Sequence, residues 1–360
     1  MKHPVIAYID LSALQNNLTK IKNMVPQSKI LAMVKGNAYG HQAVPIARAL
    51  DGKVEVFGVA CLDEAIKLHD AGIKTPIVIL KGFFDSDDLA IIQRFNFETV
   101  LHNYQQIEIL EKTKLMHPLK VWLKIDTGMH RLGFPLAAVQ DVYQRLMANN
   151  LIVKPLRLMT HFSDADDITK NKTNDQTEKF FATVKGLAGE YCLANSSAIL
   201  NWEKTRVAWV RPGITLYGVS PVASLSAEKL GLIPVMTLTS RIITIHNLKK
   251  GDTVGYGSTW VCPCDMRVGI VDIGYGDGYP RVIKTGAPVL LHGKRCPLIG
   301  RVAMDMINLD LRDHPQARVG DEIILWGKGL PIEEVTSFTD TVSYELLCRL
   351  TSRVNFQVLN

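Results

Sequence analysis

The sequence predicts an α/β protein, with an N-terminal (β/α)8 barrel of the TIM type followed by a mostly β C-terminal domain. Two patterns support this prediction. Strand-like and helix-like segments alternate over roughly 220 residues, which is typical of parallel βαβ units and of the size of such a barrel. After about Ser220, polar and apolar residues alternate between glycine-rich turns, as they do in antiparallel sheets. A doubly wound open sheet is the alternative for the first part.

Each barrel strand is predicted where a short apolar run is bounded by charged or turn-forming residues. The eight predicted strands are residues 30–34, 56–60, 77–80, 99–101, 119–125, 156–160, 191–194 and 208–210. Amphipathic periodicity predicts helices at residues 10–24, 43–50, 63–70, 85–95, 104–112, 136–149, 175–190 and 197–202. Gly72 follows the third helix as a C-terminal glycine would, and Pro76 introduces the next strand.

The second domain is predicted from short alternating strands. They are residues 235–248, 268–273, 289–291 and 322–326, and residues 342–350 are the one segment that reads clearly as a helix. We therefore place the barrel domain at residues 1–230 and the β-rich domain at residues 231–360. The first ~8 residues are candidates to pack with the C-terminal domain.

Composition excludes several classes of protein. The chain of 360 residues is 47% hydrophobic and 21% charged, which describes an ordinary globular protein of two domains. The net charge of +6 is spread out, with no basic run of the kind that binds nucleic acid. Cys262-Pro263-Cys264 is a lone C-x-C, so we expect no metal site and six reduced thiols. With no signal peptide and no apolar run of ~18 residues, we expect no membrane association and a cytoplasmic location.

The segment at residues 30–40 is the strongest local signal of chemistry. A buried apolar strand ends on Lys35, the turn-forming Gly36, Asn37 and Gly40 follow, and Tyr39 lies four residues past the lysine. A lysine at the end of a rigid strand can be shielded from water, which favours the neutral amine that forms Schiff bases. The alternative is a surface lysine that ends a strand.

Charged and polar residues recur at the carboxyl ends of the predicted strands, where a barrel builds its active site. These residues are Lys35, Lys124 with Asp126, His161, Asn195 with Ser196, and Arg211. The segments that follow the last two strands, residues 195–197 and 211–214, offer hydroxyl and backbone N–H groups suited to a phosphate. Alternatively, Ser196 only caps a helix and Gly213 only turns the chain. A lysine opposite a phosphate site favours pyridoxal 5'-phosphate, the cofactor that needs both.

Short segments along nearly the whole chain carry a family resemblance. They are residues 34–40 (VKGNAYG), 123–133 (LKIDTGMHRLG), 161–162 (HF), 195–196 (NS), 210–218 (VRPGITLYG), 254–257 (VGYG), 274–281 (GYGDGYPR) and 300–305 (GRVAMD). In order and spacing they resemble the bacterial, pyridoxal phosphate-dependent alanine racemases of fold type III. The resemblance implies an isomerase that interconverts L- and D-alanine and supplies D-alanine for peptidoglycan.

The resemblance also implies a two-base mechanism. Lys35 would form a Schiff base with the cofactor and exchange a proton on one face of the substrate. Tyr256, from the second subunit of a head-to-tail homodimer, would serve the opposite face. A free phenol has a pKa of ~10, so Tyr256 needs a supporting network, for which His161 and Arg211 are the candidates.

Further roles follow from the same resemblance. Arg211 would face the pyridine nitrogen and keep it unprotonated. The remaining cofactor-binding residues would be Tyr39, His161, Asn195, Ser196, Gly213, Ile214 and Tyr344. Arg131 and the backbone N–H of Met304 would bind the substrate carboxylate, with Lys124 carbamylated to orient Arg131. The substrate entrance would be formed by Tyr275, Arg281 and Arg301. Ala303 stands where relatives often carry Cys or Ser.

Three alternatives stay open at this point. The first is a racemase of broader amino-acid specificity on the same scaffold. The second is a non-catalytic pyridoxal phosphate carrier with a similar barrel, which the β domain bearing Tyr256 argues against. The third is a decarboxylase of related fold, which Tyr256 and Arg211 disfavour.

Overall fold

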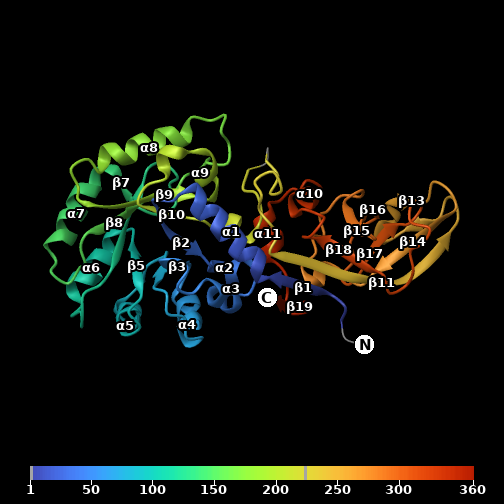
Figure 1. Cartoon of the computed structure of the whole chain (residues 1–360), viewed down its shortest axis with the longest axis horizontal. Helices are drawn as coiled ribbons and strands as arrows, with labels where there is room; N and C mark the ends of the chain where they lie inside the picture. The colour runs from blue at the N-terminus through green and yellow to red at the C-terminus, as the bar shows by residue number, and fades with distance from the viewer. Residues whose placement is uncertain (1–2, 223–224) are drawn as a thin grey trace. The chain divides into compact units, whose positions relative to one another are not determined.

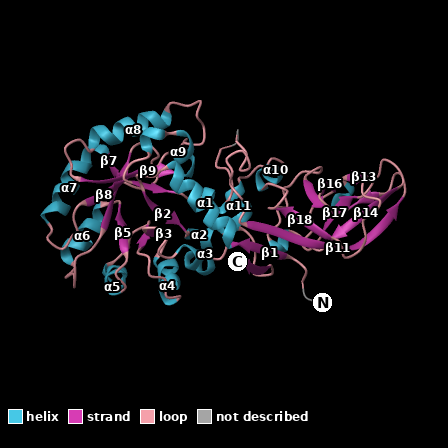
Figure 2. Ribbon diagram, viewed as in Figure 1, coloured by secondary structure: helices cyan, strands magenta, loops and turns pink. Residues whose placement is uncertain are grey.

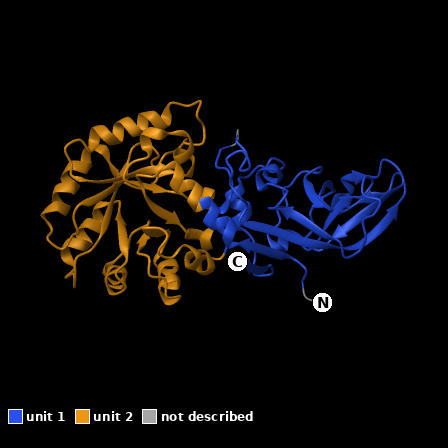
Figure 3. Ribbon diagram, in the orientation of Figure 1, with its two compact units in different colours: residues 1–17, 39–41, 217–360 blue, residues 18–38, 42–216 orange. Residues whose placement is uncertain are grey.

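The computed structural model describes residues 3–222 and 225–360, and the chain divides into two compact units (Figure 3). One unit contains Leu18–Ala38 and Gln42–Leu216. The other contains the N-terminal segment up to Asn17, the short segment Tyr39–His41 and the chain from Tyr217 onward. The helix α1 (Leu11–Met24) contributes residues to both units.

The first unit is a closed barrel of eight parallel strands, as predicted (Figure 1). The strands are β2 (Lys29–Met33), β3 (Val56–Val59), β4 (Ile77–Ile79), β5 (Glu98–Leu101), β6 (Val121–Asp126), β8 (Leu156–Met159), β9 (Gly189–Asn195) and β10 (Trp209–Arg211). Because β5 pairs with β6 as well as with β4, the sheet closes on itself, so the open doubly wound alternative is wrong. A further short strand, β7 (Phe134–Pro135), pairs with the end of β6.

Buried apolar runs explain why these segments become central strands. All four residues of β3 and all three of β4 are buried, as expected of parallel strands covered on both faces. Helices alternate with the strands in sequence and surround them in space (Figure 2). They are α3 (Ala43–Leu50), α4 (Leu62–Asp70), α5 (Ser86–Arg94), α6 (Tyr104–Lys112), α7 (Val139–Ala148), α8 (Lys172–Thr183) and α9 (Ser196–Asn201).

One barrel helix differs clearly from its prediction. The sequence pattern suggested a helix over residues 175–190, but α8 begins three residues earlier, at Lys172, and ends at Thr183. Gly186 adopts a left-handed backbone with φ of 81°, which a right-handed helix cannot contain, and β9 already begins at Gly189. The apolar periodicity beyond residue 183 therefore belongs to a turn and a strand.

The amino-terminal end of the barrel holds a self-neutralising cluster of aromatic and charged side chains. The guanidinium of Arg157 lies 4.8 Å from the ring centre of Trp122 and 4.6 Å from that of Trp209. Its Nη1 donates to Glu98 at 2.5 Å, and its Nε lies 3.6 Å from Glu190. Each tryptophan indole also donates to one of these carboxylates. Aromatic and charged side chains therefore fill this end of the barrel, and each buried charge has an opposite charge beside it.

The second unit is built on an eight-stranded sheet. Its strands are β1 (Ile6–Asp10), β11 (Met236–Leu248), β14 (Met266–Val271), β15 (Pro288–Leu291), β16 (Lys294–Ile299), β17 (Ile307–Asp310), β18 (Glu322–Trp326) and β19 (Asn355–Leu359). The long strand β11 pairs with β1, β14 and β18, and β1 also pairs with β19 in parallel. A small hairpin of β12 (Thr253–Val254) and β13 (Trp260–Val261) is separate from this sheet.

The predictions for this unit were correct for the longer elements and incomplete for the short ones. The expected strands at 235–248, 268–273, 289–291 and 322–326 correspond to β11, β14, β15 and β18. The strands β1, β12, β13, β16, β17 and β19 were not predicted. The described part of this unit also contains α10 (Ile332–Thr336) and α11 (Ser343–Cys348), of which the sequence predicted only α11. Across residues 3–222 and 225–360, no helix is long and apolar enough to span a membrane.

We expect substitution of Arg157 by Ala to lower the free energy of unfolding by about 3 kcal/mol, because the buried carboxylate of Glu98 loses its shortest ion pair. This carboxylate then keeps the indole of Trp122 and the more distant Lys120. Urea titration followed by circular dichroism measures this change. The matched control is Arg145→Ala, which breaks an exposed pair with Glu111 and should cost less than about 1 kcal/mol. Equal effects of the two substitutions would contradict the buried-pair argument.

Candidate active site

Lys35 lies directly beyond the carboxyl end of β2, where the backbone is anchored on both sides. The N–H of Met33 donates to Pro212 beyond β10, and the N–H of Val34 donates to Gly58 in β3, each at 3.0 Å. β2 itself is buried apart from its first residue. The chain is therefore held rigidly up to the residue before the lysine.

A left-handed helical turn follows Lys35, where the sequence indicated only a glycine-containing turn. Gly36, Asn37, Ala38 and Tyr39 have φ values of 62°, 54°, 57° and 52°. For L-residues other than glycine this conformation costs roughly 1–2 kcal/mol each, and asparagine tolerates it best. Such a turn persists only where its surroundings hold it in place.

Three hydrogen bonds hold this turn inside the barrel unit. The N–H of Gly36 donates to the carboxylate of Glu64 at 2.7 Å, and the side-chain oxygen of Asn37 accepts from Ala43 at 2.9 Å. The N–H of Ala38 donates to the carbonyl of Val34 at 2.8 Å. The sequence reasoning missed Glu64, because it lies in helix α4 and no local pattern links it to a turn 28 residues earlier.

Arg211 is the last residue of β10 and its guanidinium is buried, with 5% exposure. Its Nη1 donates to the carbonyl of Cys192 at 3.0 Å, and its Nη2 donates to the carbonyl of Thr160 at 2.9 Å. The same Nη2 lies 3.2 Å from Nδ1 of His161. Because a guanidinium can only donate, Nδ1 of His161 must be the acceptor and carries no proton.

Four cationic side chains, Lys35, Lys124, Arg131 and Arg211, act together on this end of the barrel. Burial, followed by the charges of Arg211, Lys124, Arg131 and Lys35, holds the pKa of His161 well below its ordinary value, so this imidazole is neutral. The predicted strand-end residues of β2, β6, β8 and β10 are thus brought within electrostatic reach of one another. The arrangement favours an anionic ligand.

The same surroundings lower the pKa of Lys124 to about 7. Burial is the largest cause, the charges of Arg211, Arg131 and Lys35 add to it, and Asp126 opposes it. A large fraction of this amine is therefore neutral near physiological pH, although an exposed lysine would be fully protonated.

Asp126 fixes the loop that carries Arg131. Its Oδ1 accepts from the backbone N–H groups of Gly128, Met129 and His130 at 2.9, 3.1 and 3.0 Å. Burial alone would raise the pKa of Asp126, but the N–H groups of His130 and Gly128 outweigh it and keep the pKa below its usual value. The carboxylate is therefore charged when it holds this loop.

Asn195 and Ser196 have different roles. The sequence left open that Ser196 caps the helix. Asn195 ends β9 and caps α9 by accepting from the N–H of Ala198 at 3.0 Å, so the helix cap is Asn195 and not Ser196. The hydroxyl of Ser196, 4% exposed, accepts from the N–H of Gly213 at 2.8 Å and lies 3.1 Å from the hydroxyl of Thr215. This contact ties the end of β9 to the segment that begins Gly213–Ile214.

The other predicted site residues belong to the second unit. Tyr39 is buried with its ring 5.1 Å from that of Tyr217 and 5.8 Å from that of Tyr344, which lies on α11. Tyr256 follows the β12 strand and is 70% exposed. Met304 is half exposed.

The predicted entrance residues are Tyr275, Arg301 and Arg281, and they have different surroundings. Tyr275 donates its N–H to the carbonyl of Ala303 at 3.1 Å, and the next residue donates to Met304 at 2.8 Å. Arg301 lies beside Gly257, because a Cβ atom on that glycine would lie 3.1 Å from its guanidinium. Arg281 is exposed on the surface of the unit.

Comparison with known proteins gives matches along almost the full length. The alanine racemase N-terminal domain matches residues 9–221, and the alanine racemase C-terminal domain matches residues 235–358. The alanine racemase of Coxiella burnetii is 48% identical over 355 residues, which is 97% of each chain. The crystal structure of biosynthetic alanine racemase from Pseudomonas aeruginosa has a TM-score of 0.97 at 41% identity and covers 100% of both chains. Alanine racemase from Bartonella henselae, with covalently bound pyridoxal phosphate, has a TM-score of 0.89 at 26% identity over 99% of each chain.

We expect the pKa of Lys124 to rise in Arg131→Gln, because one of the positive charges that lower it is removed. Carbon-13 NMR of lysines labelled at Cε, recorded in buffer free of carbon dioxide, measures this pKa. Arg145→Gln is the control, because Arg145 pairs with Glu111 and is not among the charges that act on Lys124. This substitution should leave the pKa of Lys124 unchanged. An unchanged pKa in Arg131→Gln would mean that the charge of Arg131 does not contribute to the lowered value.

The lowered pKa also fixes the sign of one contribution to the pH dependence of stability. Between pH 7 and 10.5, the folded chain binds fewer protons at Lys124 than the unfolded chain does. This group therefore makes stability rise with pH across that window, and it contributes no slope below it.

Proposed function

The chain belongs to the alanine racemase family, and we propose that it interconverts L- and D-alanine with pyridoxal phosphate held at the carboxyl end of its barrel. The observation that carries the proposal is the group of four cationic side chains around the neutral His161, with Lys35 at the end of β2. An anionic cofactor that is also an aldehyde fits a site that offers both positive charge and a lysine amine.

The residues present fit the cofactor group by group. Lys35 would hold it covalently through the amine, and Arg211 would face its ring nitrogen. The phosphate would be bound by Tyr39, Ser196, Gly213, Ile214 and Tyr344, with His161 and Asn195 completing the cofactor-binding set. When bound, pyridoxal phosphate supplies an electron sink for the charge left at Cα when a proton is removed.

Arg211 acts on this chemistry by staying charged and fixed. Its guanidinium is held by the carbonyls of Thr160 and Cys192, and it cannot lose its proton near neutrality. A permanent cation facing the ring nitrogen keeps that nitrogen unprotonated. The weaker electron sink that results limits side reactions, which suits an enzyme that only moves protons.

Two proton carriers act at Cα in this proposal. The amine of Lys35 exchanges a proton on one face, and the phenol of Tyr256 exchanges a proton on the other. Tyr256 is supplied by the second subunit of a homodimer. Its exposure of 70% supports this part of the proposal, because its side chain is not buried within its own unit.

The substrate carboxylate is bound by Arg131 and by the backbone N–H of Met304, and Tyr275, Arg281 and Arg301 line the way in. Fixing the Arg131 loop through Asp126 reduces the entropy lost when this ion pair forms. Ala303 provides no side-chain hydrogen bond beside Met304.

The surroundings of Lys124 support the proposed carbamylation of this residue. Only a neutral amine combines with carbon dioxide, and burial among cations keeps a large fraction of this amine neutral near pH 7. The product carries a negative charge among Arg211, Arg131 and Lys35, so the modification turns repulsion into attraction. It would orient Arg131 toward the substrate.

The cellular role that fits is supply of D-alanine for peptidoglycan in the cytoplasm of a bacterium. The barrel domain would span residues 1–230 and bind the cofactor, and the β-rich domain would span residues 231–360. The alternatives of a broader racemase and a single-domain carrier are not supported, because similar full-length proteins are alanine racemases and the C-terminal domain of that family is present. A decarboxylase has no support for the same reason.

We expect purified protein to racemise either enantiomer of alanine in the presence of pyridoxal phosphate, and Lys35→Ala to lower the rate by about 10³-fold or more, since both the cofactor anchor and a base are lost. Chiral chromatography of the product measures this. Lys81→Ala is a matched control, because Lys81 also follows a barrel strand, β4, but has no proposed part in the reaction. Undiminished racemisation in Lys35→Ala without an added amine would overturn the assignment.

Bicarbonate labelled with carbon-13 should give a carbamate NMR signal in the native chain and none in Lys124→Ala. A signal that persists in Lys124→Ala would place the carbamate on another lysine. Absence of any signal in the native chain would sink the proposed modification while leaving the racemase assignment intact.

A further inference from the structure

Tyr39 is held in a backbone conformation that it would not adopt alone. Its φ of 52° is left-handed, which an aromatic L-residue rarely accepts, and it is 8% exposed. A strained residue of this kind keeps its conformation only when neighbouring groups fix both its backbone and its side chain. The neighbours that do so within the same compact unit are His41, Tyr217 and helix α11.

His41 fixes the backbone of Tyr39. It is fully buried, and its Nδ1 lies 3.0 Å from the carbonyl oxygen of Tyr39. A carbonyl can only accept, so Nδ1 carries the proton and donates it. This hydrogen bond spans two residues and closes the end of the left-handed turn.

Tyr217 fixes the ring of Tyr39 and is itself packed against His41. The ring of Tyr217 is stacked on the imidazole, with centres 4.5 Å apart and planes 26° apart, and its other neighbour is the ring of Tyr39 at 5.1 Å. Tyr217 is 1% exposed, and burial followed by Tyr39 holds its pKa well above the ordinary value, so it stays a neutral packing surface.

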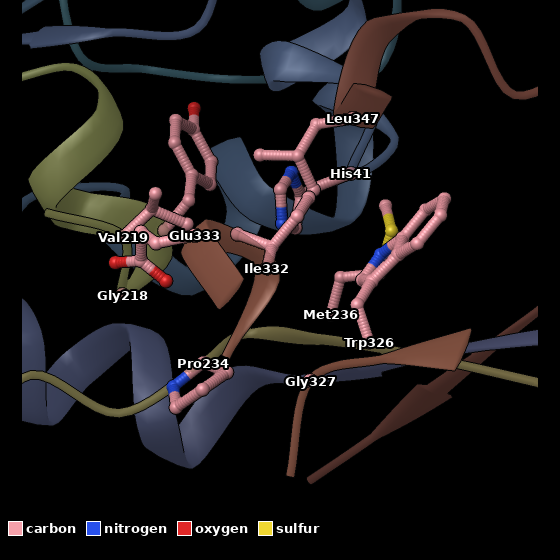
Figure 4. A pocket seen from close by; sticks show the side chains of 11 residues that line it. His41, Gly218, Val219, Pro234, Met236, Trp326, Gly327, Ile332, Glu333 and Leu347 are labelled. Carbon is pink, nitrogen blue, oxygen red and sulfur yellow. The ribbon is translucent and has the colours of Figure 1, made fainter. Parts of the chain in front are cut away.

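His41 also borders a small cavity that is lined mostly by apolar residues, together with Tyr217 and Glu333. Figure 4 shows the imidazole beside Leu347 and Ile332, with Met236 and Trp326 further along the same cavity. The cavity leaves about 10 Å³ for the centre of a water molecule, which is close to what a single water needs. The burial of His41, its hydrogen bond to Tyr39 and its stacking on Tyr217 therefore hold it in place beside this cavity.

Gly40 brings the same turn against the helix that carries Tyr344. A Cβ atom on Gly40 would lie 2.0 Å from the carbonyl oxygen of Leu347 in α11, so only glycine allows this approach. The close contact leaves the rings of Tyr39 and Tyr344 side by side. The two tyrosines of the proposed phosphate site thus depend on one tightly packed turn.

We propose that His41 is a positioning residue for cofactor binding: with Tyr217, it holds Tyr39 in the one conformation in which its hydroxyl reaches the phosphate. The inference rests on the proposed role of Tyr39 and extends it to residues that do not touch the cofactor. It differs from a merely structural role in one respect. Loss of the hydrogen bond to Tyr39 weakens recognition of the phosphate and leaves recognition of the rest of the cofactor intact.

The test compares two isosteric substitutions and two ligands. In His41→Asn the amide lies near the position of Nδ1 and can still donate to Tyr39, whereas in His41→Gln it lies near Nε2 and cannot. The full chain, freed of cofactor with hydroxylamine, is titrated with pyridoxal 5'-phosphate and with pyridoxal, which lacks the phosphate. We expect His41→Gln to raise the Kd for pyridoxal 5'-phosphate about three- to tenfold, with less than about a twofold change for pyridoxal. His41→Asn should bind both ligands nearly as the native chain does.

A double substitution tests the coupling between His41 and Tyr39. Tyr39→Phe alone should also weaken binding of the phosphorylated ligand selectively, and adding His41→Gln should then have little further effect, because both act through the same hydroxyl. His314→Gln is the control for lost stability. His314 is a buried histidine of the same unit that contacts the carbonyl of Arg295. It should leave the ratio of the two affinities unchanged.

The outcomes separate the inference from the proposed function. Equal weakening of both ligands in His41→Gln, or additive effects in the double variant, would overturn the positioning role. A selective effect in Tyr39→Phe with none in His41→Gln would do the same while leaving Tyr39 as a phosphate ligand. If Tyr39→Phe itself shows no selectivity, the phosphate assignment of Tyr39 is wrong and the inference falls with it.

Discussion

Repulsion between like charges is the interaction on which the barrel end depends. Burial lowers the pKa of Lys124, and the charges of Lys35 and Arg211, at the ends of other strands, lie close enough to lower it further. The protein tolerates this because the carbonyls of Thr160 and Cys192 bind Arg211, while Lys124 and His161 give up charge. In the proposed site, a bound phosphate or carboxylate would supply the compensation that the side chains lack.

The rigid strand and the strained turn that follows it have complementary effects. β2 fixes where the amine of Lys35 begins, since its backbone is hydrogen-bonded on both sides. The left-handed turn follows Lys35, and Tyr39 at its end packs against Tyr217. A right-handed helix after Lys35 would point the tyrosine elsewhere. The strained conformation therefore sets the direction of the Tyr39 side chain, and contacts of Glu64, Asn37 and His41 each hold part of the turn.

The barrel could be predicted from sequence because buried parallel strands leave a strong local signal. Short apolar runs between amphipathic helices located all eight strands, and the charged residues at their ends followed from the strand positions. Contacts between distant residues left no such signal. The parallel pairing of β1 with β19 joins opposite ends of the chain, and the bond from Glu64 to Gly36 crosses from a helix to a turn. The left-handed turn was not predicted, because a glycine at position 36 does not indicate that the next three residues also have positive φ.

The packing of Arg157 between Trp122 and Trp209 has a consequence for the barrel before the cofactor binds. Those charges are matched within the barrel, so cohesion at that end does not wait for a ligand. Amide hydrogens near the start of β6 and β10 should then exchange slowly with solvent at all times, and those near the strand ends should slow when an anion binds. A newly made barrel would therefore be held together at its amino-terminal end before the cofactor binds at the other.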